Sequence, residues 1–156
     1  MTIRQLSILA LSTSAVLGGV LALAQEPQPS RADQIVRYRQ SAMYLIGANF
    51  GQMAGVVTGK LPYDAADFAT RADRVAYLAA MATEGFAPES KGGSPSKAKA
   101  NIWSNRADFD KKLKDMQDKT RALAVAAKSN DLNSIKPAFG AAGQGCKACH
   151  DEYKEK

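Results

Sequence analysis

The last residues of the chain carry both of its cysteines and its only histidine. Cys146 and Cys149 are three positions apart, and His150 follows the second cysteine directly. Side chains of these types at this spacing can attach a c-type haem, bind zinc or carry out thiol exchange. The rest of the sequence has to distinguish these kinds of chemistry.

Zinc binding and thiol exchange fit poorly. A structural zinc site needs four ligands and a catalytic site needs three plus water, whereas this chain offers only two cysteines and one histidine, all within five consecutive residues. A thioredoxin-like cysteine pair usually begins a helix that follows a strand, and this motif instead closes a chain without a strand pattern. Both readings are therefore less favourable than haem attachment.

Covalent haem attachment agrees with each feature of the motif. Cysteines three positions apart lie on one side of a helical turn, so each can form a thioether with one vinyl group of the porphyrin. His150 would then be the proximal ligand of the iron. The sequence predicts one covalently attached haem c per chain, held by Cys146 and Cys149.

The N-terminal segment has the pattern of a secretory signal peptide. Arg4 is the only charge in residues 1–24, and an apolar run over residues 6–23 ends in small residues. A single-span membrane anchor is the alternative, but Gly18 and Gly19 interrupt the run, which is short for a bilayer. We predict a cleaved signal peptide over residues 1–24 and a mature protein in the periplasm that is not attached to the membrane.

The remaining chain has the length of one domain with a core. We expect a polar linker over residues 25–30 and the domain over residues 31–156. Loss of Arg4 from 21 basic residues leaves 20 Lys and Arg against 15 Asp and Glu. Because acidic residues are interleaved with the lysines and the protein is exported, we expect no nucleic-acid partner. The basic surface is either simply solvated or attracts an acidic redox partner.

Hydrophobic periodicity predicts helices throughout the domain. Val36, Met43 and Phe50 recur every seven residues, and Asp64 has the type and position of an N-cap. Phe109, Leu113, Met116 and Leu123 define the apolar side of a third helix. The predicted elements are a helix over residues 31–58, a helix from 64 to about 83, a loop with little structure over 89–101, and a helix from about 103 to 128.

The start of the fourth helix is ambiguous. With Asp131 as the N-cap, Pro137 would lie in the helix interior, where proline costs about 3 kcal/mol. With Ser134 as the N-cap, Pro137 would fall in the first turn, where amide donors lack helical partners anyway. We predict the start at Ser134. The fold class that follows is all-α, an antiparallel four-helix bundle with covalently attached haem c.

The second axial position of the iron cannot be another histidine, because the chain has only one. A methionine, a lysine or an open position remain. Met43 is the best-placed methionine, although it could equally be a core residue. Arg39 precedes it by one turn on the same face, and a buried guanidinium needs an anionic partner such as a haem propionate. Alternatively, Arg39 extends to solvent at the end of the bundle.

Over nearly the whole domain the chain resembles the class II cytochromes c, and most of all the cytochrome c′ family. A CxxCH motif near the C-terminus separates this class from ordinary cytochromes c, which carry it near the N-terminus. The segments that carry the resemblance are Tyr38-Arg39-Gln40-Ser41-Ala42, Leu61-Pro62-Tyr63-Asp64, Ile102-Trp103-Ser104 and Cys146-Lys147-Ala148-Cys149-His150-Asp151.

The resemblance implies a role for each of several residues, although the loop over residues 86–91 departs from the glycine-richer version of relatives. Lys154, one turn beyond His150, stands where relatives often have a basic residue. The implied haem residues are Cys146 and Cys149 as attachment points, His150 as proximal iron ligand, Arg39 and Gln40 at the haem edge, Ser90 and Lys91 approaching the haem from the loop, and Met43 on the distal side.

The family divides into high-spin members with an open sixth position and low-spin members in which a methionine of the first helix ligates the iron. The run from Tyr38 to Ala42 resembles the high-spin group. We therefore expect a periplasmic, five-coordinate haem protein that binds NO or CO, with electron transfer as a second role and Met43 packed over the iron. The alternative is a low-spin Met/His-ligated electron carrier.

Two further expectations concern activity and assembly. The sequence shows no nucleophile with a base and no phosphate loop, so we do not expect an enzyme. A third interpretation, an exported helical adaptor with an incidental thiol pair, would lack haem altogether. Many relatives dimerise, and we expect a homodimer; the candidate residues for its face are Tyr44, Gly47, Gly51, Ala65 and Ala69.

Overall fold

The computed structural model describes residues 28–156, so the predicted signal peptide and the first half of the linker lie outside the described residues. None of the described helices is long and apolar enough to cross a membrane. The elements in chain order are α1 (Arg31–Val57), α2 (Ala65–Met81), the 3-10 helices η1 (Ala82–Phe86) and η2 (Pro88–Ser90), α3 (Asn101–Ser104), α4 (Arg106–Ala127) and α5 (Leu132–Tyr153).

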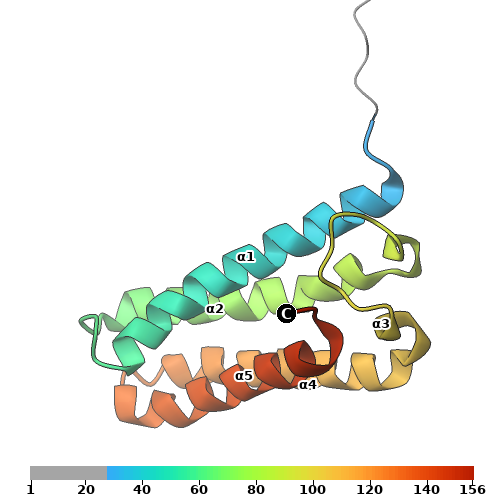
Figure 1. Cartoon of the computed structure of the whole chain (residues 1–156). Coiled ribbons are helices and arrows are strands. Elements are labelled where there is room, and N and C mark those ends of the chain that lie inside the picture. The colour runs from blue at the N-terminus through green and yellow to red at the C-terminus, as the bar shows by residue number, and fades with distance from the viewer. Residues whose placement is uncertain (1–27) are drawn as a thin grey trace, which may run out of the picture.

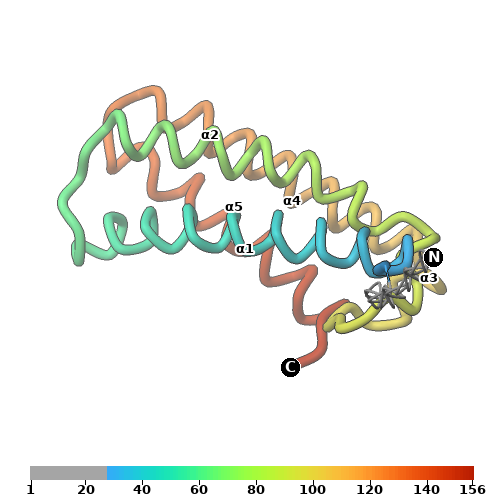
Figure 2. Tube along the Cα trace, turned by 90° about the horizontal axis from the view of Figure 1, so that it is seen from above, coloured from blue at the N-terminus to red at the C-terminus, as the bar shows by residue number. Residues whose placement is uncertain are grey.

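The long helices α1, α2, α4 and α5 form the predicted antiparallel four-helix bundle, which confirms the fold class (Figure 1). The pair α1–α2 lies above the pair α4–α5, and both short connections are at the same end of the bundle. The long connection that contains η1, η2 and α3 is at the other end (Figure 2). Helix α2 packs on α1 and α4, and α4 packs on α5, whereas α1 and α5 make little backbone contact.

Local signals explain where the first two helices begin and end. The hydroxyl of Ser30 accepts a hydrogen bond from the Asp33 amide at 3.1 Å, and the Asp64 carboxylate accepts one from the Asp67 amide at 2.9 Å. The predicted N-cap at Asp64 is therefore confirmed. Helix α1 ends just before Gly59, whose φ of +75° is a conformation that side chains with a Cβ rarely adopt.

The core lies between the helix pairs and follows the predicted apolar faces. The four residues expected on the inner side of the third helix are all buried, as are Met53 and Phe68 on the facing helices. Two aromatic contacts join α4 to its neighbours, Phe109 meeting Phe86 and Tyr153 edge to face with centroids 4.8 and 5.2 Å apart. Phe109 is thus the centre of the core at the end where the motif lies.

The third predicted helix is in fact two helices. A short α3 ends at Ser104, and α4 starts at Arg106, because Asn105 has φ −119° and ψ 51°. The change of direction allows Ile102 and Phe109 to be buried together. The prediction of a single helix from about residue 103 is therefore wrong at its start, because hydrophobic spacing does not reveal a break of one residue.

The predicted start of the fourth helix is also wrong. Asp131 is the N-cap of α5, and its carboxylate accepts hydrogen bonds from the Asn133 amide at 3.0 Å and from the hydroxyl of Ser134. Pro137 therefore lies inside the helix, on its exposed side. The additional turn buries Ile135 completely. That burial, worth about 1.5–3 kcal/mol, and the cap offset a proline cost of about 3 kcal/mol.

The predicted loop over residues 89–101 is more ordered than expected. Its residues 94–99, which we call the strap, connect α1 to the end of α5. On the α1 side, the Ser94 amide donates to Asp33 at 2.9 Å and the Gln40 amide group donates to the carbonyl of residue 95 at 2.7 Å. On the α5 side, the Lys99 amide donates to the Tyr153 carbonyl at 3.0 Å.

Replacing the N-cap of α5 tests the corrected helix start. Asp131→Ala removes the acceptor for the first-turn amide and should lower the melting temperature by a few degrees, whereas Ser134→Ala should lower it distinctly less. Thermal unfolding followed by circular dichroism measures both. The reverse ranking would mean that Ser134 is the cap.

Candidate haem pocket

A cavity of about 560 Å³ lies between α1 and α5, where these helices make little backbone contact. At one end the rings of Phe50 and Phe139 stack with centroids 4.3 Å apart, which joins α1 to α5. At the other end the strap contributes Ser96, Lys97 and Ala98 to the lining. The apolar part of the lining consists of Met43, Ile46, Phe50, Phe86, Ile102, Phe109, Leu113 and Met116.

Helix α5 brings the three motif residues to one wall of this cavity. Cys146, Cys149 and His150 all line it, and both cysteines are half-buried free thiols. Burial raises the pKa of Cys146, and burial together with the neighbouring Cys146 raises the pKa of Cys149 to about 11. Thiols that stay protonated at neutral pH are poor nucleophiles, so the site is unsuited to thiol exchange.

His150 has the protonation state that a metal ligand requires. Burial, and to a smaller degree the charge of Lys154, lower the pKa of its imidazole, which favours the neutral ring. Among residues 28–156, no three His, Cys, Asp or Glu side chains are grouped so that they could share a metal ion. The histidine therefore faces the cavity without a protein-built metal cluster around it.

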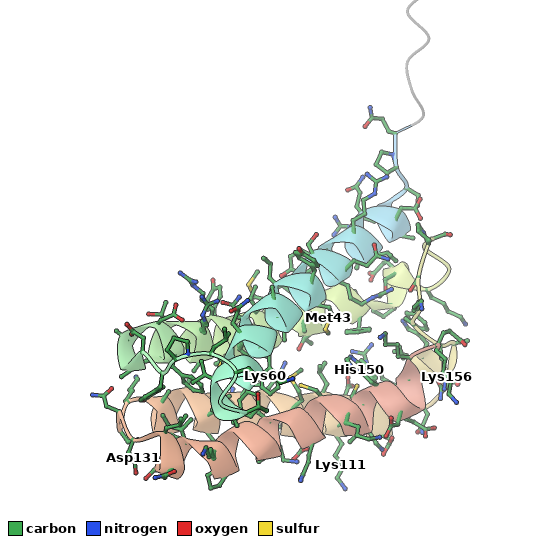
Figure 3. All side chains as sticks on the ribbon, turned by 60° about the vertical axis from the view of Figure 1, so that its left-hand side comes forward. Met43, Lys60, Lys111, Asp131, His150 and Lys156 are labelled. Atoms are coloured by element: carbon green, nitrogen blue, oxygen red, sulfur yellow. The ribbon has the colours of Figure 1, made fainter. Side chains whose placement is uncertain are left out.

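Met43 lies on the wall opposite the motif. Figure 3 shows it on α1 facing His150 on α5, and both residues line the cavity. Met43 is half-buried, and Ile46 and Phe50 continue the wall on the same helix. The surface opposite the histidine is thus apolar, with one thioether at its centre.

Arg39 is a buried cation on the cavity wall. Its residue is only 5% exposed, so the alternative in which it extends to solvent is wrong. The guanidinium donates to the Gly85 carbonyl at 2.6 Å and to the Ser96 hydroxyl at 2.7 Å, and it lies 4.9 Å from the ring centroid of Phe86. These partners are all neutral, and no Asp or Glu among the described residues forms a salt bridge with it.

A buried charge with only neutral partners leaves room for an anion in the cavity. Desolvation lowers the pKa of Arg39, which is the sign of a cation whose burial is not compensated by a carboxylate. Residue 85 has to be glycine here, because a Cβ on Gly85 would lie 2.7 Å from the Cβ of Arg39. The backbone is thereby brought close enough to hold the guanidinium in place.

The other residues implied by the resemblance are less closely grouped. Gln40 lines the rim of the cavity and holds the strap. Ser90 is buried but not part of the lining; it donates to the Ala87 carbonyl at 2.7 Å and contacts Arg39 only weakly, at 3.5 Å. Lys91 is exposed and also outside the lining. Ser90 thus supports the site indirectly, and Lys91 is not brought to it.

Sequence reasoning missed Tyr153, which lines the cavity one turn after His150. Its hydroxyl donates to the Asp108 carboxylate at 2.5 Å, and the same carboxylate oxygen accepts from Lys112 at 2.6 Å. Burial, then the hydrogen bond to Asp108, raise the pKa of Tyr153 to about 12, so the phenol stays protonated. The spacing of three residues from His150 could have indicated that Tyr153 lies on the same face of α5. No signal in the sequence indicates that its partner is Asp108 on α4.

Comparison with known proteins decides the family. The family model described as Cytochrome C′ matches residues 34–154. The chain belongs to the cytochrome c′ family. A cytochrome c′ from Alcaligenes xylosoxydans xylosoxydans is 40% identical over 129 residues, which cover 83% of this chain and 99% of that protein.

Solved structures of cytochrome c′ share the fold. Cytochrome c prime from Shewanella frigidimarina is 48% identical, with a TM-score of 0.77, and covers 83% of this chain and 100% of its own. A nitric oxide complex of a mutant cytochrome c prime from Alcaligenes xylosoxidans is 39% identical, with a TM-score of 0.75 and coverage of 83% and 100%. The resemblance inferred from the sequence is therefore confirmed.

Cytochromes c′ bind one covalently attached haem c per chain, and haem c is the cofactor of this chain. The residues present fit such a group. The cavity is mostly apolar, and its two free cysteines lie on one wall beside the histidine. At its edge lies a buried guanidinium that has no carboxylate partner among residues 28–156. An apolar macrocycle with two carboxylates would satisfy all of these features.

Proposed function

We propose that this cytochrome c′ is a periplasmic protein that binds NO or CO at a five-coordinate haem c, with electron transfer as a second role. The observation that carries the proposal is the apolar wall around Met43, which faces His150 across the cavity. The signal-peptide pattern of residues 1–24 supports export to the periplasm.

The motif residues are proposed to hold the cofactor. Cys146 and Cys149 would each form a thioether, and His150 would ligate the iron from the proximal side. The bound haem supplies an iron coordination position for a small ligand and a one-electron redox change. Support comes from the placement of all three side chains on one wall and from the neutral state of the imidazole.

The distal wall favours small neutral ligands over polar ones. Met43, Ile46 and Phe50 offer no strong hydrogen-bond donor, so a polar ligand entering between them would lose its hydration without compensation. NO and CO lose little by the same transfer. The nitric oxide complex of the similar Alcaligenes xylosoxidans protein supports this ligand class.

One observation favours a second candidate function. Met43 itself faces His150, and a thioether is an established haem ligand that raises the reduction potential. Ligation by Met43 would make the protein a low-spin electron carrier with no open position. The two candidates differ only in whether the thioether bonds to iron or packs over it.

Replacing Met43 distinguishes the two functions. If Met43 only covers the iron, the wild-type ferrous protein has a high-spin five-coordinate absorption and resonance Raman spectrum. Met43→Ala then keeps that spectrum and binds CO on the order of tenfold faster, as removal of about 1.4 kcal/mol of steric barrier would allow. Stopped-flow CO binding measures the rate, and Met81→Ala on α2, outside the cavity lining, is the control. A low-spin wild type that becomes high-spin in Met43→Ala would instead establish the electron carrier.

We further propose that Arg39 pairs with a haem propionate, since it is the buried cation without an anionic protein partner described above. Arg39→Met should lower the reduction potential, because loss of a nearby positive charge stabilises the ferric state. The shift should be on the order of tens of millivolts for a charge in surroundings with an effective dielectric constant of about 20. Spectroelectrochemical titration measures it. Arg37→Met removes an exposed charge from the same helix, and an equal shift in that control would contradict the pairing.

A homodimer through the exposed face of α1 is also proposed. Tyr44 is 75% exposed, and Gly51 is an exposed glycine with open space around it, which allows a second helix to approach closely. Tyr44 and the exposed Gly47 also line the cavity, so this face adjoins the cavity opening. Tyr44→Glu should convert the dimer to a monomer in sedimentation equilibrium, whereas Val125→Glu on α4, at a residue 68% exposed, should not. A monomeric wild type at micromolar concentration would refute this assembly. Ala65 and Ala69 are half-buried in α2 and contribute less surface.

A further inference from the structure

A hydrogen-bonded group joins α4 to the last turn of α5 directly behind the proximal wall. Tyr153 is 2% exposed, and its hydroxyl donates to Asp108 at 2.5 Å and accepts from the Asn105 amide group at 3.3 Å. Lys112 donates to the same Asp108 oxygen at 2.6 Å and lies 5.9 Å from the centroid of the Tyr153 ring. Asn105 and Lys112 thus each add a hydrogen bond to the phenol–carboxylate pair of Tyr153 and Asp108.

This group is anchored to the turn that carries the proximal histidine. Tyr153 is three residues after His150, and the Lys154 amide donates to the His150 carbonyl at 3.2 Å. The Tyr153 ring and the imidazole both line the cavity. A rotation of this turn about the helix axis would therefore move the imidazole and the phenol together.

Core packing alone does not explain the phenol. A phenylalanine would keep the edge-to-face contact with Phe109, whose ring centroid is 5.2 Å away. Asp108 is partly exposed and already paired with Lys112, so water could replace the phenol as a partner of its carboxylate. A hydrogen bond from a hydroxyl to a charged carboxylate is stronger than one between neutral groups, and it also has a defined direction. Directional hydrogen bonds in the surroundings of a metal ligand fix the orientation of its side chain.

We propose that Tyr153 is a positioning residue for His150: its hydrogen bond to Asp108, held in turn by Lys112, fixes the last turn of α5 against α4 and so sets the orientation of the imidazole. The proposal deepens the function given above and rests on His150 being the proximal ligand. It adds three residues on two helices to the determinants of haem ligation, and none of them touches the ligand-binding side.

The test is made on the haem-loaded protein, where the hyperfine-shifted NMR resonances of the His150 ring in the ferric state depend on ring orientation whichever spin state is present. Tyr153→Phe should shift these resonances and change the reduction potential while the protein still folds and keeps its haem. Asp108→Asn should shift them in the same direction by less, since an amide oxygen can still accept from the phenol. Asp118→Asn, which breaks the exposed pair with Lys114 on the same helix, is the control and should change neither.

The outcomes separate this inference from the proposed function. If both Tyr153→Phe and Asp108→Asn keep the histidine resonances and the reduction potential of the wild type, Tyr153 has a merely structural role, even if the melting temperature falls. That result would overturn the inference and leave the proposed haem function intact. Absence of shifted histidine resonances from the wild type would refute ligation by His150, and the inference would fall with it. If Tyr153→Phe does not fold, Asp108→Asn alone decides by the same criterion.

Discussion

The separation of α1 from α5 is the constraint on which the site depends. In a bundle without a cofactor every neighbouring pair of helices would close on its apolar face. Here the contacts of α2 with α1 and α4, and of α4 with α5, carry the packing, and the fourth interface has little backbone contact and includes the stacked rings of Phe50 and Phe139. The cavity is the result of that missing interface, with the cysteines and the histidine on its α5 wall and Met43 with its apolar neighbours on its α1 wall.

The charged and neutral groups of the site lie in separate places. The wall on α5 carries neutral thiols and a neutral imidazole, the wall on α1 is apolar around Met43, and Arg39, a buried cation, is at the edge. The neutral state of the thiols and of the imidazole follows from desolvation, which favours the uncharged form of Cys and His. Arg39 stays charged because its intrinsic pKa is too high for burial to neutralise it.

How much could be predicted from sequence depended on how local each signal is. The motif from Cys146 to His150 is contiguous, so its chemistry was accessible without a structure, and the apolar spacing of α1 led to Met43. The start of α5 was not accessible, because the cost of Pro137 is local whereas the burial of Ile135 depends on the packing of the whole core. The partnership of Tyr153 with Asp108 joins residues 45 apart, and no spacing rule relates them.

The strap has a mechanical consequence for the cavity. Its residues are bonded to Asp33 and Gln40 on one side and to the end of α5 on the other, where the Glu155 amide also donates to the Lys97 carbonyl at 2.8 Å. It therefore acts as a cross-brace between two helices that have little direct contact. At this end of the cavity, α1 and α5 can move apart only if hydrogen bonds to the strap break first. The rigidity of this end of the cavity is therefore set by a loop and not by the packing of the bundle.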